Sequence, residues 1–214
     1  MTDMSMDSAQ QQAQLAEEAK KEALSIDNQK FAMWLYLASE VVIFTVFIAA
    51  YVVFRIREPE IVHEVHEALG FVGILLVTFN TFLLLTSSWS MVMGLREIQR
   101  DNVQGLTRWF SITAILGTIF VILQYIEYQR LGEEAVTLDF ASDAFGGFGM
   151  HFYAPTAFHG VHVIVGVIWC LEVMRRARNG RYSSKNNVGV EVFGLYWHFV
   201  DVVWILLFTL IYLV

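Results

Sequence analysis

The chain of 214 residues is strongly apolar, with 56% hydrophobic and only 16% charged residues. Soluble domains carry about a quarter of charged residues, so this balance favours a membrane protein. The net charge of −7 argues against a nucleic-acid partner, and the single cysteine, Cys170, excludes an internal disulfide or a Cys-based metal site.

Five apolar segments are long enough to cross a bilayer, which takes about 20 residues. They cover residues 31–54, 68–95, 109–128, 145–171 and 192–214. Residues 1–30 form a polar arm, and its stretch 9–24 suits either a short surface helix or a disordered segment. The sequence therefore predicts an all-α integral membrane bundle of five transmembrane helices.

Basic residues set the orientation of such a bundle, because cytoplasmic connections carry an excess of Lys and Arg. Eleven of the fourteen lie on the side of the N-terminal arm: Lys20, Lys21, Lys30, Arg96, Arg100, Arg108, Arg175, Arg176, Arg178, Arg181 and Lys185. The opposite connections are acidic: Glu58, Glu60, Glu64 and Glu67 in one, Glu133, Glu134, Asp139 and Asp143 in the other. We therefore expect a cytoplasmic N-terminus and a C-terminus outside.

Ionisable side chains inside a membrane are costly, by about 2.5 kcal/mol or more, and each of them needs an explanation. Counted from the cytoplasmic ends of their spans, Glu40, Asp201 and His162 reach a similar depth. His159 and His198 each lie one turn away from this layer. We expect these five residues to form a buried polar network. The alternative is a local pairing of Asp201 with His198 and Trp donors, with Glu40 neutral and alone.

Two further polar residues, Gln124 and Glu127, lie about twenty residues into the third span and hence near the outer surface. We interpret them as an outer interfacial pair. A metal or haem role for His159, His162 and His198 is disfavoured, because the neighbouring carboxylates would crowd such a site. We therefore expect no catalytic, cofactor or metal ligands in this chain.

Several strings then resemble subunit III of the haem–copper respiratory oxidases. The most specific reads Tyr-Trp-His-Phe-Val-Asp-Val-Val-Trp over residues 196–204. Residues 158–164, Ser39-Glu40, Asn80-Thr81 with residues 84–88, and residues 124–128 resemble the earlier helices of that family, in the same order. The resemblance covers residues 31–214.

This resemblance implies a non-catalytic subunit of a proton-pumping enzyme complex that reduces oxygen to water in a bacterial cell membrane. The haem and copper would lie in partner subunits. The chain would pack against subunit I, contact subunit II and other oxidase subunits, sustain proton uptake and protect the complex from inactivation. Glu40 matches the intramembrane carboxylate of the family. The acidic outer connections suggest cytochrome c as a partner near the outer face.

Many family members have seven helices, and this chain is similar to the five-helix variety, without the first two. In the longer members lipid fills a cleft beside those two helices, so a bound phospholipid stays open here. The electron donor, cytochrome c or quinol, also stays open, with a cytochrome c oxidase favoured. The rival interpretations are an accessory subunit of a nitric oxide reductase, a di-histidine haem b anchor and a small proton-coupled transporter.

Overall fold

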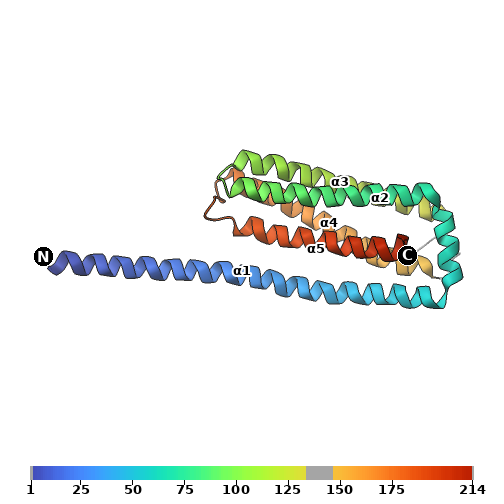
Figure 1. Ribbon diagram of the computed structural model, residues 1–214, viewed down its shortest axis with the longest axis horizontal. Coiled ribbons are helices and arrows are strands. Elements are labelled where there is room, and N and C mark those ends of the chain that lie inside the picture. Colours follow the sequence, from blue (N-terminus) through green and yellow to red (C-terminus); the bar gives the residue numbers. More distant parts are fainter. Residues whose placement is uncertain (1, 134–146, 214) are drawn as a thin grey trace.

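The computed structural model describes residues 2–133 and 147–213, and these form a bundle of long helices (Figure 1). The helices are α1 (Thr2–Arg57), α2 (Pro59–Ile98), α3 (Val103–Glu133), α4 (Phe148–Arg178) and α5 (Val188–Phe208). A short π-helix, η1 (Thr209–Leu213), continues α5.

Five of these helices are long and apolar enough to cross a membrane within the described part of the chain. The spans are Asn28–Arg57, Gly70–Ile98, Val103–Gly132, Phe148–Arg178 and Val188–Leu213. The prediction of an all-α bundle with five transmembrane helices is confirmed. The described helices mostly reach beyond the predicted spans, because polar and charged residues at their ends continue the helix into the interface.

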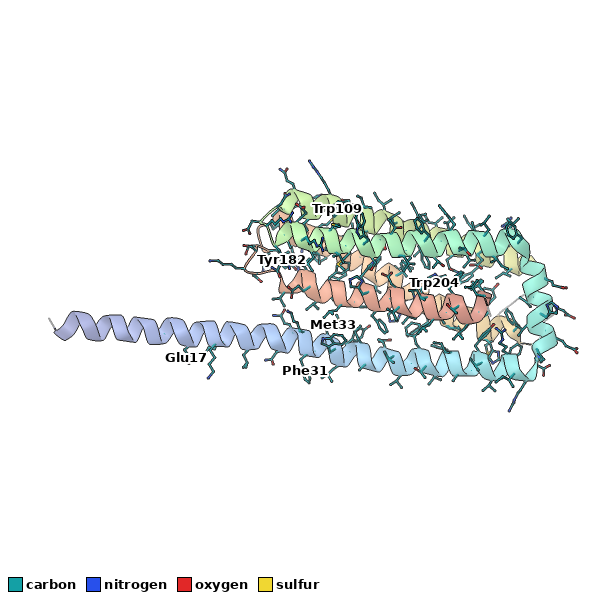
Figure 2. All side chains as sticks on the ribbon, viewed as in Figure 1. Glu17, Phe31, Met33, Trp109, Tyr182 and Trp204 are labelled. Carbon is teal, nitrogen blue, oxygen red and sulfur yellow. The ribbon has the colours of Figure 1, made fainter. Side chains whose placement is uncertain are left out.

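The polar arm and the first span form one uninterrupted helix, α1, which extends far beyond the bundle at its N-terminal end (Figure 1). Where α1 meets the bundle, Met33 faces α5 and packs against the core, whereas Phe31 points away from it (Figure 2). An ion pair of 2.6 Å between Lys30 Nζ and Glu191 Oε2 also fastens α1 to the first turn of α5.

The second helix contains a sharp bend at Gly70, whose backbone has φ 59° and ψ 177°. This conformation is essentially restricted to glycine, because a Cβ atom would strain the backbone there. Figure 1 shows the part of α2 before the bend running across the end of the bundle, and the part after it running along the bundle. The acidic residues Glu60, Glu64 and Glu67 therefore lie on a crossing segment outside the predicted span.

The fifth span is the most enclosed of the five. In its most apolar stretch of 18 residues, 56% of the residues are buried, whereas the corresponding share is 28% in the first and second spans. Its two tryptophans are fully enclosed, and each indole nitrogen donates to a hydroxyl on α2: Trp197 to Ser87 at 3.0 Å and Trp204 to Thr81 at 2.9 Å. These bonds satisfy buried donors in an apolar interior. Figure 2 shows Trp204 among the helices at the centre of the bundle.

Candidate functional site

The closest acid–imidazole contact in the bundle joins α1 to α4. Glu40 Oε2 lies 3.3 Å from His162 Nε2, and both side chains are about 10% exposed (11% and 9%). Glu40 is buried on the face of α1 that contacts the other helices, whereas the apolar side chains of Val41 and Val42 are exposed. The pair therefore lies at the edge of the bundle.

The hydrogen bonding of His162 limits the protonation of this pair. Its Nδ1 lies 2.9 Å from the carbonyl oxygen of Phe158, which can only accept a hydrogen bond. Nδ1 must therefore carry a proton, and an unprotonated Nε2 would face Glu40 as a second acceptor. The two atoms form no well-aligned hydrogen bond at 3.3 Å, but a proton on either Glu40 or Nε2 would remove the repulsion between a carboxylate and this acceptor. The pair then has no net charge in either arrangement, which reduces its cost at membrane depth.

Aromatic side chains surround the Glu40–His162 pair. The ring of Phe44 lies 5.4 Å from that of His162, and Tyr196 stacks on it at 6.3 Å. The hydroxyl of Tyr196 donates to the carbonyl oxygen of His162 at 2.9 Å. Tyr36, one turn before Glu40, interacts with its carboxyl and stacks on Tyr196 at 6.5 Å. These contacts fix the imidazole in position and exclude bulk water from it.

Asp201 and His198 lie on α5, where their nearest polar partner comes from α2. The hydroxyl of Ser88 lies 2.6 Å from Nδ1 of His198 and also interacts with the Asp201 carboxyl. Neither oxygen of Asp201 has a well-formed hydrogen bond to another described residue. The structure thus brings Asp201 and His198 to a serine hydroxyl, and it does not bond Asp201 to Glu40 or His162.

The most deeply enclosed of the predicted residues is His159, which has no exposed surface. Its ring stacks on Trp204 at 4.9 Å and meets the edge of Phe120 at 5.7 Å. Both ring nitrogens lack a hydrogen-bond partner among the described residues. A buried polar group without a partner costs about 1–3 kcal/mol. Among the described residues, His159 is therefore held by ring packing and not by hydrogen bonds.

The residues interpreted as an outer interfacial pair, Gln124 and Glu127, are buried in the structure, with 3% and 4% exposure. Gln124 Nε2 donates to Glu127 Oε2 at 2.7 Å, and the Tyr212 hydroxyl of η1 also interacts with Glu127. The pair faces inward because η1 closes over it. A hydrogen bond also links η1 to α1, because Arg55 of α1 donates to the carbonyl oxygen of Leu210 at 3.1 Å.

The predicted residues therefore fall into four local groups within the described chain: Glu40 with His162, Asp201 and His198 with Ser88, His159 with Trp204, and Gln124 with Glu127. No three His, Cys, Asp or Glu side chains of residues 2–133 and 147–213 gather as metal ligands would. Of the acidic outer connections, Glu134, Asp139 and Asp143 lie outside the described residues.

Sequence reasoning did not single out Ser88, Tyr36, Tyr196 and Tyr212 as partners of the buried ionisable groups. Serine and tyrosine are ordinary in membrane helices, and depth alone does not reveal the direction of a side chain around its helix. A signal was present for Ser88, which lies in a run of three small hydroxyl residues, 86–88, that close helix packing tolerates.

Comparison with known proteins gives one consistent family. A family model described as cytochrome c oxidase subunit III matches residues 10–214. Cytochrome c oxidase subunit 3 of Thermostichus vulcanus is 37% identical over 87% of this chain and 88% of that protein. Its counterpart from Synechocystis is 40% identical over 87% of this chain and 76% of its own length. Quinol oxidase subunit 3 of Bacillus spizizenii is 30% identical over 84% of each chain.

The match extends through all five spans and includes every residue of the four polar groups. The resemblance seen in the short motifs is thereby confirmed. The chain belongs to the cytochrome c oxidase subunit III family.

Proposed function

We propose that this chain is the non-catalytic subunit III of a proton-pumping haem–copper oxidase, which reduces oxygen to water in a bacterial plasma membrane. It packs against subunit I, contacts subunit II and other subunits of the complex, and leaves the haem and copper to those partners. Family membership over residues 10–214 and the five membrane spans support this proposal.

The Glu40–His162 pair is the observation that links this chain to proton uptake. It binds a single proton at the edge of the bundle, between α1 and α4, where a partner subunit or lipid completes its surroundings. The proton can move between Glu40 and His162 without changing the net charge of the pair, whereas passing it on leaves one negative charge that the next proton neutralises. Its role is to support proton supply to subunit I and so to delay inactivation during turnover.

The wider network of Glu40, His159, His162, His198 and Asp201 is part of this proposal. Direct bonds link only some of these residues, so the remaining links require water.

The decisive experiment compares Glu40→Ala and His162→Leu with the control Ser39→Ala in the purified oxidase. Ser39 adjoins Glu40 on α1, but its exposed hydroxyl only donates to the carbonyl oxygen of Tyr36. Both pair variants are expected to keep near-normal initial oxygen consumption and to inactivate several-fold faster during turnover, while the control behaves as the wild type. Complete loss of initial turnover in an intact complex would contradict the accessory role.

The electron donor that we propose is cytochrome c. The relatives named cytochrome c oxidase from Thermostichus vulcanus and Synechocystis are 37% and 40% identical, whereas the relative named quinol oxidase is 30% identical. Oxygen consumption by the purified complex with reduced cytochrome c, and then with a quinol, separates the two donors. Turnover with the quinol alone would reject this part of the proposal.

The crossing segment of α2 would then help to orient cytochrome c at the outer face. Its Glu60, Glu64 and Glu67, with the adjoining Glu58, are acidic, and a basic partner is attracted to such a surface. Replacing these four residues by glutamine is expected to weaken the salt dependence of electron entry. An unchanged salt dependence would reject this role.

A further inference from the structure

A shallow pocket of about 290 Å³ lies where the first turns of α3 meet the last turn of α4. It is lined by Val103, Gln104, Thr107, Arg108 and Arg178. The pocket is at the end of the bundle that carries the basic connections, and it is remote from the Glu40–His162 pair.

The two arginines of the pocket bring positive charge that the described chain does not neutralise. Neither Arg108 nor Arg178 forms an ion pair with a described carboxylate, whereas Arg175 and Arg176, on the same turn of α4 as Arg178, both bind Glu172. Two arginines that line one pocket suit a phosphate, which accepts paired N–H donors from guanidinium groups.

The surface that continues from the pocket toward the membrane interior is apolar. On α3, Ile112, Ile115 and Ile119 are 41%, 58% and 38% exposed, and on α4, Leu171 and Ile168 are 51% and 61% exposed. These side chains follow the pocket at intervals of three and four residues, so they lie along the two flanks of the α3–α4 contact. A free anion would use the arginines alone, while an amphiphile would use both the charged pocket and the apolar flanks.

We propose that this pocket binds the headgroup of an anionic phospholipid, with its phosphate on Arg108 and Arg178 and its acyl chains along α3 and α4. Basic pockets between helices on the cytoplasmic side of a membrane suit this class of lipid, and the cytoplasmic leaflet supplies it. The lipid binds as a neutralising ligand of the α3–α4 junction, independently of the proton-linked pair.

The first test measures lipid selectivity of the purified oxidase in nanodiscs of phosphatidylglycerol and phosphatidylcholine. We compare the wild type with the double variant Arg108→Gln/Arg178→Gln and with the control Arg96→Gln/Arg100→Gln, which removes the same charge at the same end but outside the pocket. The pocket variant is expected to bind phosphatidylglycerol roughly ten-fold more weakly, since each basic residue contributes to the attraction. The control is expected to retain the selectivity of the wild type.

The second test needs no variant. A phosphatidylglycerol with a photoactivatable group near its headgroup is irradiated with the wild-type complex, and the labelled peptides are sequenced. Labelling within residues 103–108 and 175–178 supports the site. The proposal would be overturned by labelling only elsewhere, or by equal lipid selectivity of the pocket variant and the wild type. Loss of another subunit from the complex when these arginines are replaced would also overturn it, because the arginines would then bind a protein.

Discussion

At the scale of single residues, glycine has different roles at different positions of α4. A Cβ atom on Gly166 would lie 2.6 Å from Cζ3 of Trp197 and 3.2 Å from Tyr196, whereas one on Gly160 would meet no atom within 4 Å. The absence of a side chain at position 166 therefore lets α4 and α5 approach each other, with the Trp197 ring filling the space.

Replacing Gly166 by alanine is expected to destabilise the subunit by about 1–3 kcal/mol, the usual cost of overpacking a filled core. The aromatic rings of Trp197 and Tyr196 are enclosed and cannot move aside without shifting α5. Thermal unfolding of the purified complex measures the loss. Gly160→Ala is the matched control, and equal midpoints for the two variants would show that this contact is not limiting.

Outside the membrane, the carboxylate of Asp101 joins two connections that are far apart in the sequence. It accepts hydrogen bonds from the backbone N–H of Ser184 at 2.6 Å and from the Ser184 hydroxyl at 2.7 Å. These two bonds hold the pKa of Asp101 below its ordinary value of 3.8, and the bond from the backbone N–H has the larger effect. They favour the ionised carboxylate, so they are strongest when the group has lost its proton.

The sign of the pH effect follows from this lowered pKa. The stabilisation of the connection is complete above pH 3.8 and is lost as the pH falls through the lower pKa of the folded state. We expect the protection of the Ser184 amide against hydrogen exchange to decrease only in that acidic range. In Asp101→Asn the protection should be weaker at neutral pH and independent of pH. A wild-type profile that is flat into strong acid would contradict this assignment.

The limits of sequence reasoning are also visible at this scale. Glu40 and His162 lie at one level when residues are counted along their spans, and the structure puts them 3.3 Å apart. Depth along a span does not reveal that His159 faces Trp204 or that His198 faces Ser88. The direction of a side chain depends on how each helix is rotated against its neighbours. The burial of Gln124 and Glu127 was also hidden, because nothing in the sequence indicates that Tyr212 of η1 packs against them.

At the scale of the elements, the spans were predictable because their length and hydropathy are set by the thickness of the bilayer. Their order in the bundle was not, since all five are apolar around much of their surface. The central position of α5 results from its enclosed aromatic residues, which find hydroxyl partners on α2. The bend of α2 at Gly70 was equally hidden, because glycine is common in membrane helices.

The bend gives a prediction about backbone strain rather than packing. A Cβ atom on Gly70 would meet no atom within 4 Å, yet the backbone there has φ 59° and ψ 177°. Gly70→Ala is therefore expected to cost about 1–3 kcal/mol through strain alone. The control is Gly132→Ala, which also enters open space but has no positive φ, and which is expected to be neutral or slightly stabilising.

Thermal unfolding of both variants separates the two causes, since only the strained position should lose stability. A loss at both positions would mean that alanine is disfavoured for another reason, such as contact with a partner subunit. Unchanged stability in Gly70→Ala would mean that α2 can straighten without cost.

At the scale of the whole molecule, the five spans place the two ends of the described chain on opposite sides of the membrane (Figure 1). We predict which side is which from charge, because positive residues resist transfer out of the cytoplasm. Arg175, Arg176 and Arg178 lie in the last turn of α4, and Arg181 and Lys185 lie in the connection that follows. The crossing segment of α2 is acidic. The proton-linked role that we propose for the Glu40–His162 pair and the proposed lipid pocket both depend on this orientation.

Cysteine labelling tests the orientation with little background, because the single native cysteine, Cys170, is fully buried and its thiol donates to the carbonyl oxygen of Phe110. We expect Glu60→Cys to react with a membrane-impermeant maleimide in intact cells, since this residue would lie on the outer face. Lys185→Cys should react only after the membrane is made permeable. The reverse labelling pattern would show that the predicted orientation in the membrane is wrong. It would place the basic pocket in the outer leaflet and the acidic crossing segment in the cytoplasm, where it could not attract cytochrome c, so both assignments depend on this one measurement.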